Sequence, residues 1–227
     1  MNRDRVLGLT MPVLRPAVRM LAPLRRADLA ALPAPDGRVV LYGDSITEAA
    51  EWDELLPDLP TANRGIGGDT TVDLLARLGD GPGRPRAISL LIGTNDLHAG
   101  PRTRRPAGIA DRVEDIVGRL RRAHPDAILV VNGLTPRTGL LAPRIRQLAT
   151  LYRRIAEQHG ARFLDPFPLL ADAEGNIRPE YAHDRLHLTT AGYRVWCTAL
   201  RPLLDDVGPA LRHHQGPDRT PEPGSRV

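Results

Sequence analysis

Residues 39–45 read VVLYGDS, an apolar run with β-branched residues that ends at a glycine and is followed at once by Asp44 and Ser45. A short apolar run of this kind indicates a strand that is buried on both faces, as in a parallel sheet. Residues 87–96 read AISLLIGTND and repeat the arrangement, with Asn95 in the polar segment after the glycine. The two stretches therefore predict buried strands that carry polar residues at their carboxyl ends.

Further runs extend this pattern along the chain, and segments with helical periodicity separate them. Strands are predicted over 39–42, 61–64, 87–92, 127–131 and 161–164. Helices are predicted over 70–78, 109–120, 141–155 and 189–204, where apolar residues recur at helical spacing. Strands that alternate with helices through right-handed crossovers form a parallel sheet covered on both faces. The predicted class is α/β with a five-stranded parallel sheet, and in the order 2-1-3-4-5 the first and third strands are neighbours.

The composition along the chain divides it into three parts. Residues 1–35 alternate apolar residues and arginines between prolines, which predicts a broken helical arm that packs on the domain; contact with a membrane surface is the alternative. Residues 36–206 contain all the predicted strands and form the domain. Residues 207–227 are rich in proline, glycine and charge without an apolar period, so we expect a disordered tail.

Charge and cysteine content exclude several classes of protein. The formal charge is +4, too small and too dispersed to predict a nucleic-acid partner, although all 31 cationic residues are arginine. The single cysteine, Cys197, excludes an intramolecular disulfide framework and fits a reducing compartment. No apolar run approaches the roughly 18–20 residues that span a bilayer, and no signal peptide is recognisable. We therefore expect a cytoplasmic protein with no nucleic-acid partner and no stable membrane insertion.

The polar residues at the carboxyl ends of the strands predict acyl-transfer chemistry. Ser45 follows the first strand, and a serine hydroxyl becomes a nucleophile when a neighbouring base takes its proton. His187 is the candidate base, and Asp184 lies close enough in sequence to orient the imidazole. Gly68, Asn95 and the Ser45 amide are the candidate donors to an oxyanion. Because parallel strands end at one edge of the sheet, these groups are expected to converge there.

Each of these residues has a plainer interpretation when it is taken alone. Ser45 could be only a helix N-cap, the glycines before Asp69 only a turn, and Asn95 only a turn residue. His183 and His187 lie four positions apart with Asp184 between them and could begin a metal site. A mononuclear site needs about three protein ligands, and His98 is the only other candidate nearby, so we predict no metal. The functional interpretation rests on all the residues together, at one edge of one sheet.

Four motifs resemble those of the SGNH (GDSL-type) hydrolases, and they occur in the order of that family. They are Gly43-Asp44-Ser45-Ile46-Thr47, Asn63-Arg64-Gly65-Ile66-Gly67-Gly68-Asp69-Thr70, Gly93-Thr94-Asn95-Asp96 and Asp184-Arg185-Leu186-His187-Leu188. The second is most similar to the branch that contains platelet-activating-factor acetylhydrolase-type esterases. The first motif has Ile46 where the family's namesake pattern has leucine, a change that touches no candidate catalytic group.

The resemblance implies a flavodoxin-like three-layer α/β/α fold and serine esterase or lipase chemistry without a cofactor. It implies Ser45 as nucleophile, the Asp184/His187 pair as orienting group and base, and Gly68, Asn95 and the Ser45 amide as the oxyanion hole. The expected reaction is hydrolysis of a short-acyl or acetyl carboxylic ester through an acyl-enzyme. The expected partner is therefore a small-molecule ester.

The sequence leaves the substrate and two rival functions open. An acyltransferase would use the same residues with an alcohol in place of water, and a binding module would hold an acylated sugar or lipid without turnover. Neither the ester nor the oligomeric state can be predicted. Candidate substrate contacts are the residues expected near the ends of the strands, namely Asp44, Trp52, Leu97, His98, Pro136, Arg137 and Tyr181.

Overall fold

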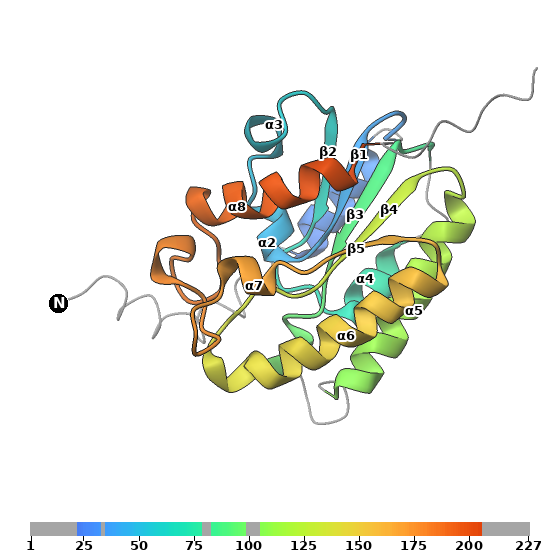
Figure 1. Cartoon of the computed structure of the whole chain (residues 1–227). Coiled ribbons are helices and arrows are strands. Elements are labelled where there is room, and N and C mark those ends of the chain that lie inside the picture. Colours follow the sequence, from blue (N-terminus) through green and yellow to red (C-terminus); the bar gives the residue numbers. More distant parts are fainter. Residues whose placement is uncertain (1–21, 33–34, 79–82, 99–104, 206–227) are drawn as a thin grey trace, which may run out of the picture.

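A computed structural model of the chain describes residues 22–32, 35–78, 83–98 and 105–205 (Figure 1). The helical arm predicted over 1–35 is therefore described only in part, and a helix covers residues 22–31. The tail predicted over 207–227 lies outside the described residues.

Five parallel strands form one sheet in the predicted order, β2-β1-β3-β4-β5. They are β1 (Val39–Gly43), β2 (Thr61–Gly65), β3 (Ala87–Leu91), β4 (Ile128–Asn132) and β5 (Arg162–Leu164). β1 pairs with β3 from Val39 opposite Ala87 to Gly43 opposite Leu91, so the two strands end at the same level. Every residue of β3 is buried because helices cover both faces of the sheet. The predicted α/β class and the flavodoxin-like three-layer arrangement are confirmed.

Helices form the two outer layers (Figure 1). On one face α4 (Thr71–Arg77), α5 (Pro106–Ala123) and α6 (Ala142–Gln158) pack side by side. On the other face α8 (Thr190–Leu200) lies against α3 (Trp52–Leu55) and α7 (Phe167–Leu170). The short helix α2 (Ser45–Glu48) follows β1 directly, and 3₁₀ turns cover Asp96–His98, Gly139–Leu141, Pro179–Tyr181 and Arg201–Leu203.

The apolar periodicity identifies the buried face of the long helices. The residues that predict α5 are all buried against the sheet: Ile109, Val113, Ile116, Val117 and Leu120. The helix begins at Pro106, whose fixed φ and missing N–H suit the first turn. The α4 helix begins as predicted, with the Thr70 side chain accepting from the Asp73 amide in a capping box.

Most boundaries differ from the predictions by a few residues, and local chemistry explains two of these differences. β4 covers Ile128–Asn132 instead of 127–131, because the polar Asn132 is accommodated in the core by side-chain hydrogen bonds. The last helix ends at Leu200, and the 3₁₀ turn Arg201–Leu203 follows it. Pro202 lacks the N–H that would continue the α-helical pattern, so the predicted extension to residue 204 is wrong.

Two buried hydrogen bonds fix α8 to the rest of the domain. The Trp196 indole N–H donates to Asn132 Oδ1 in β4 at 3.0 Å. The Tyr193 hydroxyl donates to the Ile46 carbonyl in α2 at 2.6 Å. Since α2 carries Ser45 at its start and His187 lies just before α8, these bonds set the distance between the segments that hold the two residues.

Candidate active site

The turn from β1 into α2 presents the Ser45 side chain. A Cβ on Gly43 would lie 2.5 Å from the carbonyl oxygen of Leu91, so the close approach of this turn to β3 requires glycine. Asp44 caps α2 by accepting from the Ile46 amide at 3.0 Å. Ser45 is the first residue of the helix and is partly exposed. The turn therefore buries Asp44 and leaves the next side chain accessible.

Ser45 and His187 meet although 142 positions separate them in the chain, with Ser45 Oγ 3.0 Å from His187 Nε2. On the other side of the ring, His187 Nδ1 lies 2.7 Å from Asp184 Oδ2. The hydroxyl, imidazole and carboxylate thus form one continuous hydrogen-bonded chain at the carboxyl edge of the sheet.

The short segment before α8 holds the Asp184 carboxylate as an anion. Asp184 Oδ1 accepts from the backbone amides of His187 and Leu186, at 2.8 and 3.2 Å. Arg185 lies between Asp184 and Leu186 and has φ of 64°, a left-handed conformation that curls the segment around the carboxylate. Burial by itself would raise the pKa of Asp184, but the hydrogen bonds from the His187 ring and from the backbone outweigh it and lower the pKa. An anionic carboxylate only accepts, so Nδ1 carries the proton and Nε2 is free to accept from Ser45.

The candidate oxyanion donors lie on two neighbouring loops. Gly68 follows β2 with φ of 79°, a conformation that glycine adopts without strain. Asn95 lies in the loop after β3, and its Nδ2 donates to the Asp69 carbonyl at 2.9 Å. One hydrogen bond therefore joins the Asn95 side chain to the residue that follows Gly68.

Exposure separates the candidate reactive groups from their neighbours. Ser45, Gly68, Asn95 and His187 are each partly exposed. The residues beside them in three of the four motifs, such as Asp44, Asp69, Thr94 and Asp96, are buried. The structure thus brings the predicted nucleophile, base and oxyanion donors to one accessible edge.

The seven predicted substrate contacts fall into two groups. His98 is exposed, while Arg137 and Tyr181 are partly exposed. Arg137 Nη1 donates to Thr94 Oγ1 at 3.0 Å, so the guanidinium lies beside the loop that carries Asn95. The remaining four are buried, namely Asp44, Trp52, Leu97 and Pro136.

The assignments of Trp52 and Leu97 to a pocket wall require correction. Each is 3% exposed and belongs to the hydrophobic core. The Trp52 ring packs edge-on against Trp196 with centroids 5.4 Å apart, and its indole N–H donates to the Thr47 carbonyl. The Trp52 ring packs α3 against α8, and both side chains give their apolar surface to the core, so no substrate can reach either of them in this conformation.

Asp44, the residue before the candidate nucleophile, is buried, and its pKa is shifted as a result. The residue is 1% exposed. Burial raises the pKa of Asp44 to about 7, although the Ile46 amide, His187 and Arg137 oppose the shift. A buried acid of this kind caps the helix and affects the pH dependence of stability without contacting solvent.

Glu48, Arg77 and the Asp69 carboxylate support the site through contacts that no sequence pattern predicted. Glu48 Oε2 accepts from the Gly67 amide at 2.7 Å. Arg77 donates to Asp69 Oδ2 at 2.6 Å and to the carbonyls of Gly43 and Arg64. Glu48 and Arg77 are ordinary charged residues on helices, and no local pattern distinguishes them from solvated ones.

Within the described ranges, no group of three or more His, Cys, Asp or Glu side chains is arranged to hold a metal ion. Of the residues considered for a metal, His187 faces Ser45 and Asp184, whereas His183 and His98 are exposed. Among the same described residues, no helix is both long and apolar enough to span a membrane.

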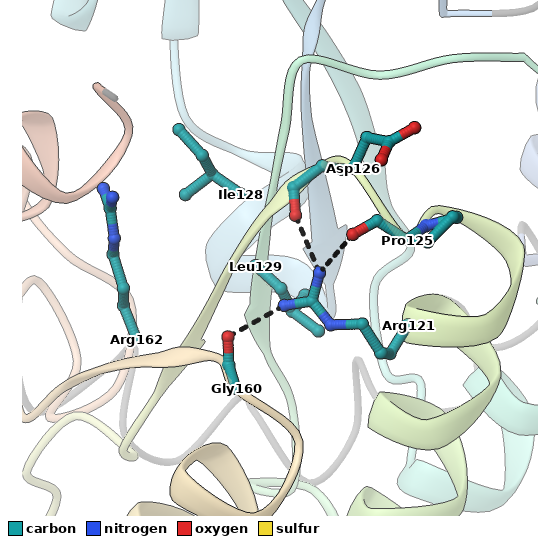
Figure 2. A pocket seen from close by; sticks show the side chains of 8 residues that line it. Arg121, Pro125, Asp126, Ile128, Leu129, Gly160 and Arg162 are labelled. Atoms are coloured by element: carbon teal, nitrogen blue, oxygen red, sulfur yellow. Dashed lines mark hydrogen bonds between the residues drawn. The ribbon is translucent and has the colours of Figure 1, made fainter. Parts of the chain in front are cut away.

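A small hollow of about 280 Å³ lies at the amino ends of β4 and β5, opposite the candidate site (Figure 2). Arg121 reaches across it and donates to the carbonyls of Pro125, Ala127 and Gly160 (Figure 2). The guanidinium joins two turns at this end of the sheet, so the hollow is part of the scaffold.

The three-layer fold and the placement of its four motifs define the SGNH class of α/β hydrolases. The chain belongs to the GDSL-like lipase/acylhydrolase family, whose model matches residues 41–195. The resemblance found in the sequence is thereby confirmed.

Two relatives agree with this membership, and two solved structures share the fold. The chain is 35% identical over 177 residues to the alpha1 subunit of platelet-activating factor acetylhydrolase IB from Homo sapiens, covering 73% of this chain and 74% of that one. It is 30% identical over 179 residues to the human alpha2 subunit, with 73% and 75% covered. A solved protein of Streptococcus pneumonia has the same fold, with a TM-score of 0.73 at 24% identity over 87% of this chain and 99% of that one. A variant of an acetylxylan esterase from Geobacillus stearothermophilus has a TM-score of 0.61 at 18% identity, over 76% and 95%.

Proposed function

We propose that this chain is a serine esterase that hydrolyses short-acyl carboxylic esters through an acyl-enzyme, with Ser45 as nucleophile. The observation that carries the proposal is the chain of contacts from Ser45 Oγ to His187 Nε2 at 3.0 Å and from His187 Nδ1 to Asp184 Oδ2 at 2.7 Å. Membership of an acylhydrolase family supports the reaction class.

The first half-reaction forms the acyl-enzyme. Ser45 Oγ attacks the ester carbonyl carbon while its proton passes to His187 Nε2. The resulting imidazolium is stabilised by the Asp184 carboxylate, which stays ionised because its pKa is lowered. The carbon–oxygen bond to the alcohol then breaks, and His187 returns the proton to the leaving alkoxide.

The second half-reaction releases the acid. A water molecule gives its proton to His187 Nε2 as its oxygen attacks the acyl carbonyl carbon. The bond to Ser45 Oγ breaks, the proton returns to that oxygen, and a carboxylic acid leaves. No cofactor takes part in either step of this scheme.

In both tetrahedral intermediates the negative oxygen needs donors that are already in place. The proposed donors are the Ser45 and Gly68 amides and the Asn95 Nδ2 group. The bond from Asn95 to the Asp69 carbonyl uses one hydrogen of that amide and leaves the other for the oxyanion. A single donor of this kind is worth about 3–4 kcal/mol of transition-state stabilisation.

Acetyl and other short-acyl esters are the proposed substrate class. The relatives and the structural neighbour are named for the removal of acetyl groups, as platelet-activating factor acetylhydrolase and acetylxylan esterase. We propose the acyl length from these names, and the alcohol part is left to a substrate series.

Hydrolysis of p-nitrophenyl acetate by the wild type and by Ser45→Ala tests the proposal. The wild type is expected to release p-nitrophenol and to be labelled at Ser45 by a fluorophosphonate, and the variant to do neither. Equal rates in the two proteins would remove Ser45 from the mechanism. Binding of acylated sugars or lipids without alcohol release would support a binding module instead, and ester exchange with an added alcohol would indicate a transferase.

A further inference from the structure

Asp69 joins the two loops that carry the proposed oxyanion donors. It follows Gly68 directly, and its carbonyl accepts from Asn95 Nδ2 at 2.9 Å. Its own amide donates to the Ile66 carbonyl at 3.2 Å, which closes the turn around Gly67 and Gly68. A displacement of Asp69 therefore moves both the Gly68 amide and the Asn95 side chain.

Two arginines hold the two oxygens of the buried Asp69 carboxylate. Arg77 Nε donates to Oδ2 at 2.6 Å, and the same guanidinium is tied to the ends of β1 and β2 through the Gly43 and Arg64 carbonyls. Arg26 Nη2 donates to Oδ1 at 3.0 Å. Arg77 thus fixes the carboxylate to the sheet, while Arg26 holds its second oxygen and restrains its rotation.

Arg26 comes from the helix over residues 22–31, which precedes the part of the chain matched by the family model at 41–195. The same nitrogen lies 3.3 Å from Asp73 Oδ1 in the first turn of α4. The Asp73 carboxylate also accepts from the Thr70 amide at 3.0 Å. The Arg26 Nη2 atom therefore contacts both Asp69, at the end of the loop, and Asp73, in the first turn of α4.

The preceding arginine reaches the other end of the same loop. Arg25 Nε lies 3.6 Å from Glu48 Oε1, and Glu48 Oε2 accepts from the Gly67 amide at 2.7 Å. Consecutive arginines of one helix thus act on the two residues that flank Gly68, through Glu48 on one side and Asp69 on the other.

From these contacts we propose that Arg26 is a positioning residue for the oxyanion hole and that it acts through the Asp69 carboxylate. The inference rests on the proposed function. It assigns a role in the reaction to the helix over 22–31, beyond packing on the domain.

A purely structural role for Arg26 predicts different measurements. Ion pairs of half-exposed arginines contribute little to stability, and the Arg26 side chain is 39% exposed. A positioning role lowers kcat with little change in KM, because the oxyanion exists only in the transition state and the intermediate. A loss of packing would lower the urea concentration at the unfolding midpoint, and kcat of the folded variant would equal that of the wild type.

The experiment compares kcat, KM and urea unfolding for the full-length wild type and a set of variants, with p-nitrophenyl acetate as substrate. Arg26→Ala is expected to lower kcat about 10-fold, less than the roughly 10²–10³-fold cost of losing a whole donor, with KM unchanged. Arg26→Lys is expected to recover most of kcat, because a single nitrogen makes both contacts. Arg119→Ala removes an exposed arginine of α5 and is the charge-matched control, expected to keep the kcat of the wild type.

A double-variant cycle shows whether Arg26 acts through Asp69. In the Asp69→Asn background, Arg26→Ala is expected to lower kcat less than 2-fold, because the carboxylate through which Arg26 acts on the loops is already absent. The proposal is overturned by a wild-type kcat for Arg26→Ala, or by an equal loss in both backgrounds. Should Arg26→Ala not fold, Arg26→Met keeps the apolar stem without the donors and is judged by the same criteria.

Ser45→Ala in the same assay separates the two levels of inference. If it keeps the esterase activity, the proposed function fails. If it is inactive while Arg26→Ala equals the wild type, only the role of Arg26 fails.

Discussion

Both carboxylate oxygens of Asp184 are bound to His187: Oδ2 lies 2.7 Å from the ring Nδ1, and Oδ1 accepts the His187 backbone N–H at 2.8 Å. The side chain therefore fixes the ring orientation relative to its own backbone segment, and as an anion it places the ring proton on Nδ1. The tautomer that can accept a proton from Ser45 thus depends on one residue three positions away.

Replacing Asp184 with asparagine is expected to lower kcat by about 10³–10⁴-fold with little change in KM. The amide oxygen can still accept the backbone bonds, but its NH₂ group then faces Nδ1 and forces the proton onto Nε2. Kinetics with p-nitrophenyl acetate measure the effect, and urea unfolding checks that the fold is kept. A folded variant with the kcat of the wild type would contradict the assigned role of Asp184.

Truncating Asn95 to alanine is expected to lower kcat about 10²-fold, because one preorganised donor is lost. Phosphonylation of Ser45 by a fluorophosphonate should slow in parallel, since that reaction also develops a negative oxygen. The nucleophile and base are untouched, so the pH profile should keep its shape. An unchanged labelling rate would show that Asn95 does not face the oxyanion.

The buried carboxyl of Asp44 predicts that stability falls as the pH rises through the weakly acidic range. Its pKa is raised from an ordinary value of about 3.9 to about 7 in the folded protein, with burial as the main cause. Between these values the folded state keeps a proton that the unfolded state has lost, so a rise in pH favours unfolding. Relative to the wild type, Asp44→Asn should gain stability from about pH 4 upward and reach a plateau above about pH 7.

The plateau difference is expected to be of the order of 4 kcal/mol, measured by urea unfolding at a series of pH values. Asparagine can still accept from the Ile46 amide, so the helix cap is kept. Parallel stability curves for the two proteins across this range would show that Asp44 does not titrate as inferred.

Asn132 is expected to be critical for stability rather than for chemistry. It is fully buried, and its side chain contacts Ser89, the Leu90 carbonyl and Trp196 at 2.9–3.0 Å. Asn132→Leu leaves the Trp196 N–H and Ser89 hydroxyl without these partners, at a cost of about 2–4 kcal/mol. Trp196→Phe in the same chain should recover part of the loss, and a single variant as stable as the wild type would contradict this account.

The strands and the edge at which the motifs gather could be predicted from local patterns, whereas the order 2-1-3-4-5 is that of the flavodoxin-like fold implied by the resemblance of the four motifs. The runs over 39–42 and 87–92 are apolar and β-rich, and parallel connections bring their carboxyl ends together. The burial of Trp52 in the core could not be predicted in this way. Its position after the Ser45 motif favours a pocket wall, but its ring packs against Trp196, which lies 144 positions later in the chain.

The amino-acid sequence was enough to predict the α/β class and the candidate reactive residues, because periodicity and turn chemistry act over short distances along the chain. The strand order was expected only because the four motifs resemble those of the SGNH hydrolases. The tertiary structure alone decided which polar groups face solvent and which support them. The contacts of Arg26 and Arg77 with the Asp69 carboxylate depend on side chains that are remote in sequence and share one buried partner. Such contacts are set by the packing of helices on the sheet, and no local sequence pattern predicts that packing.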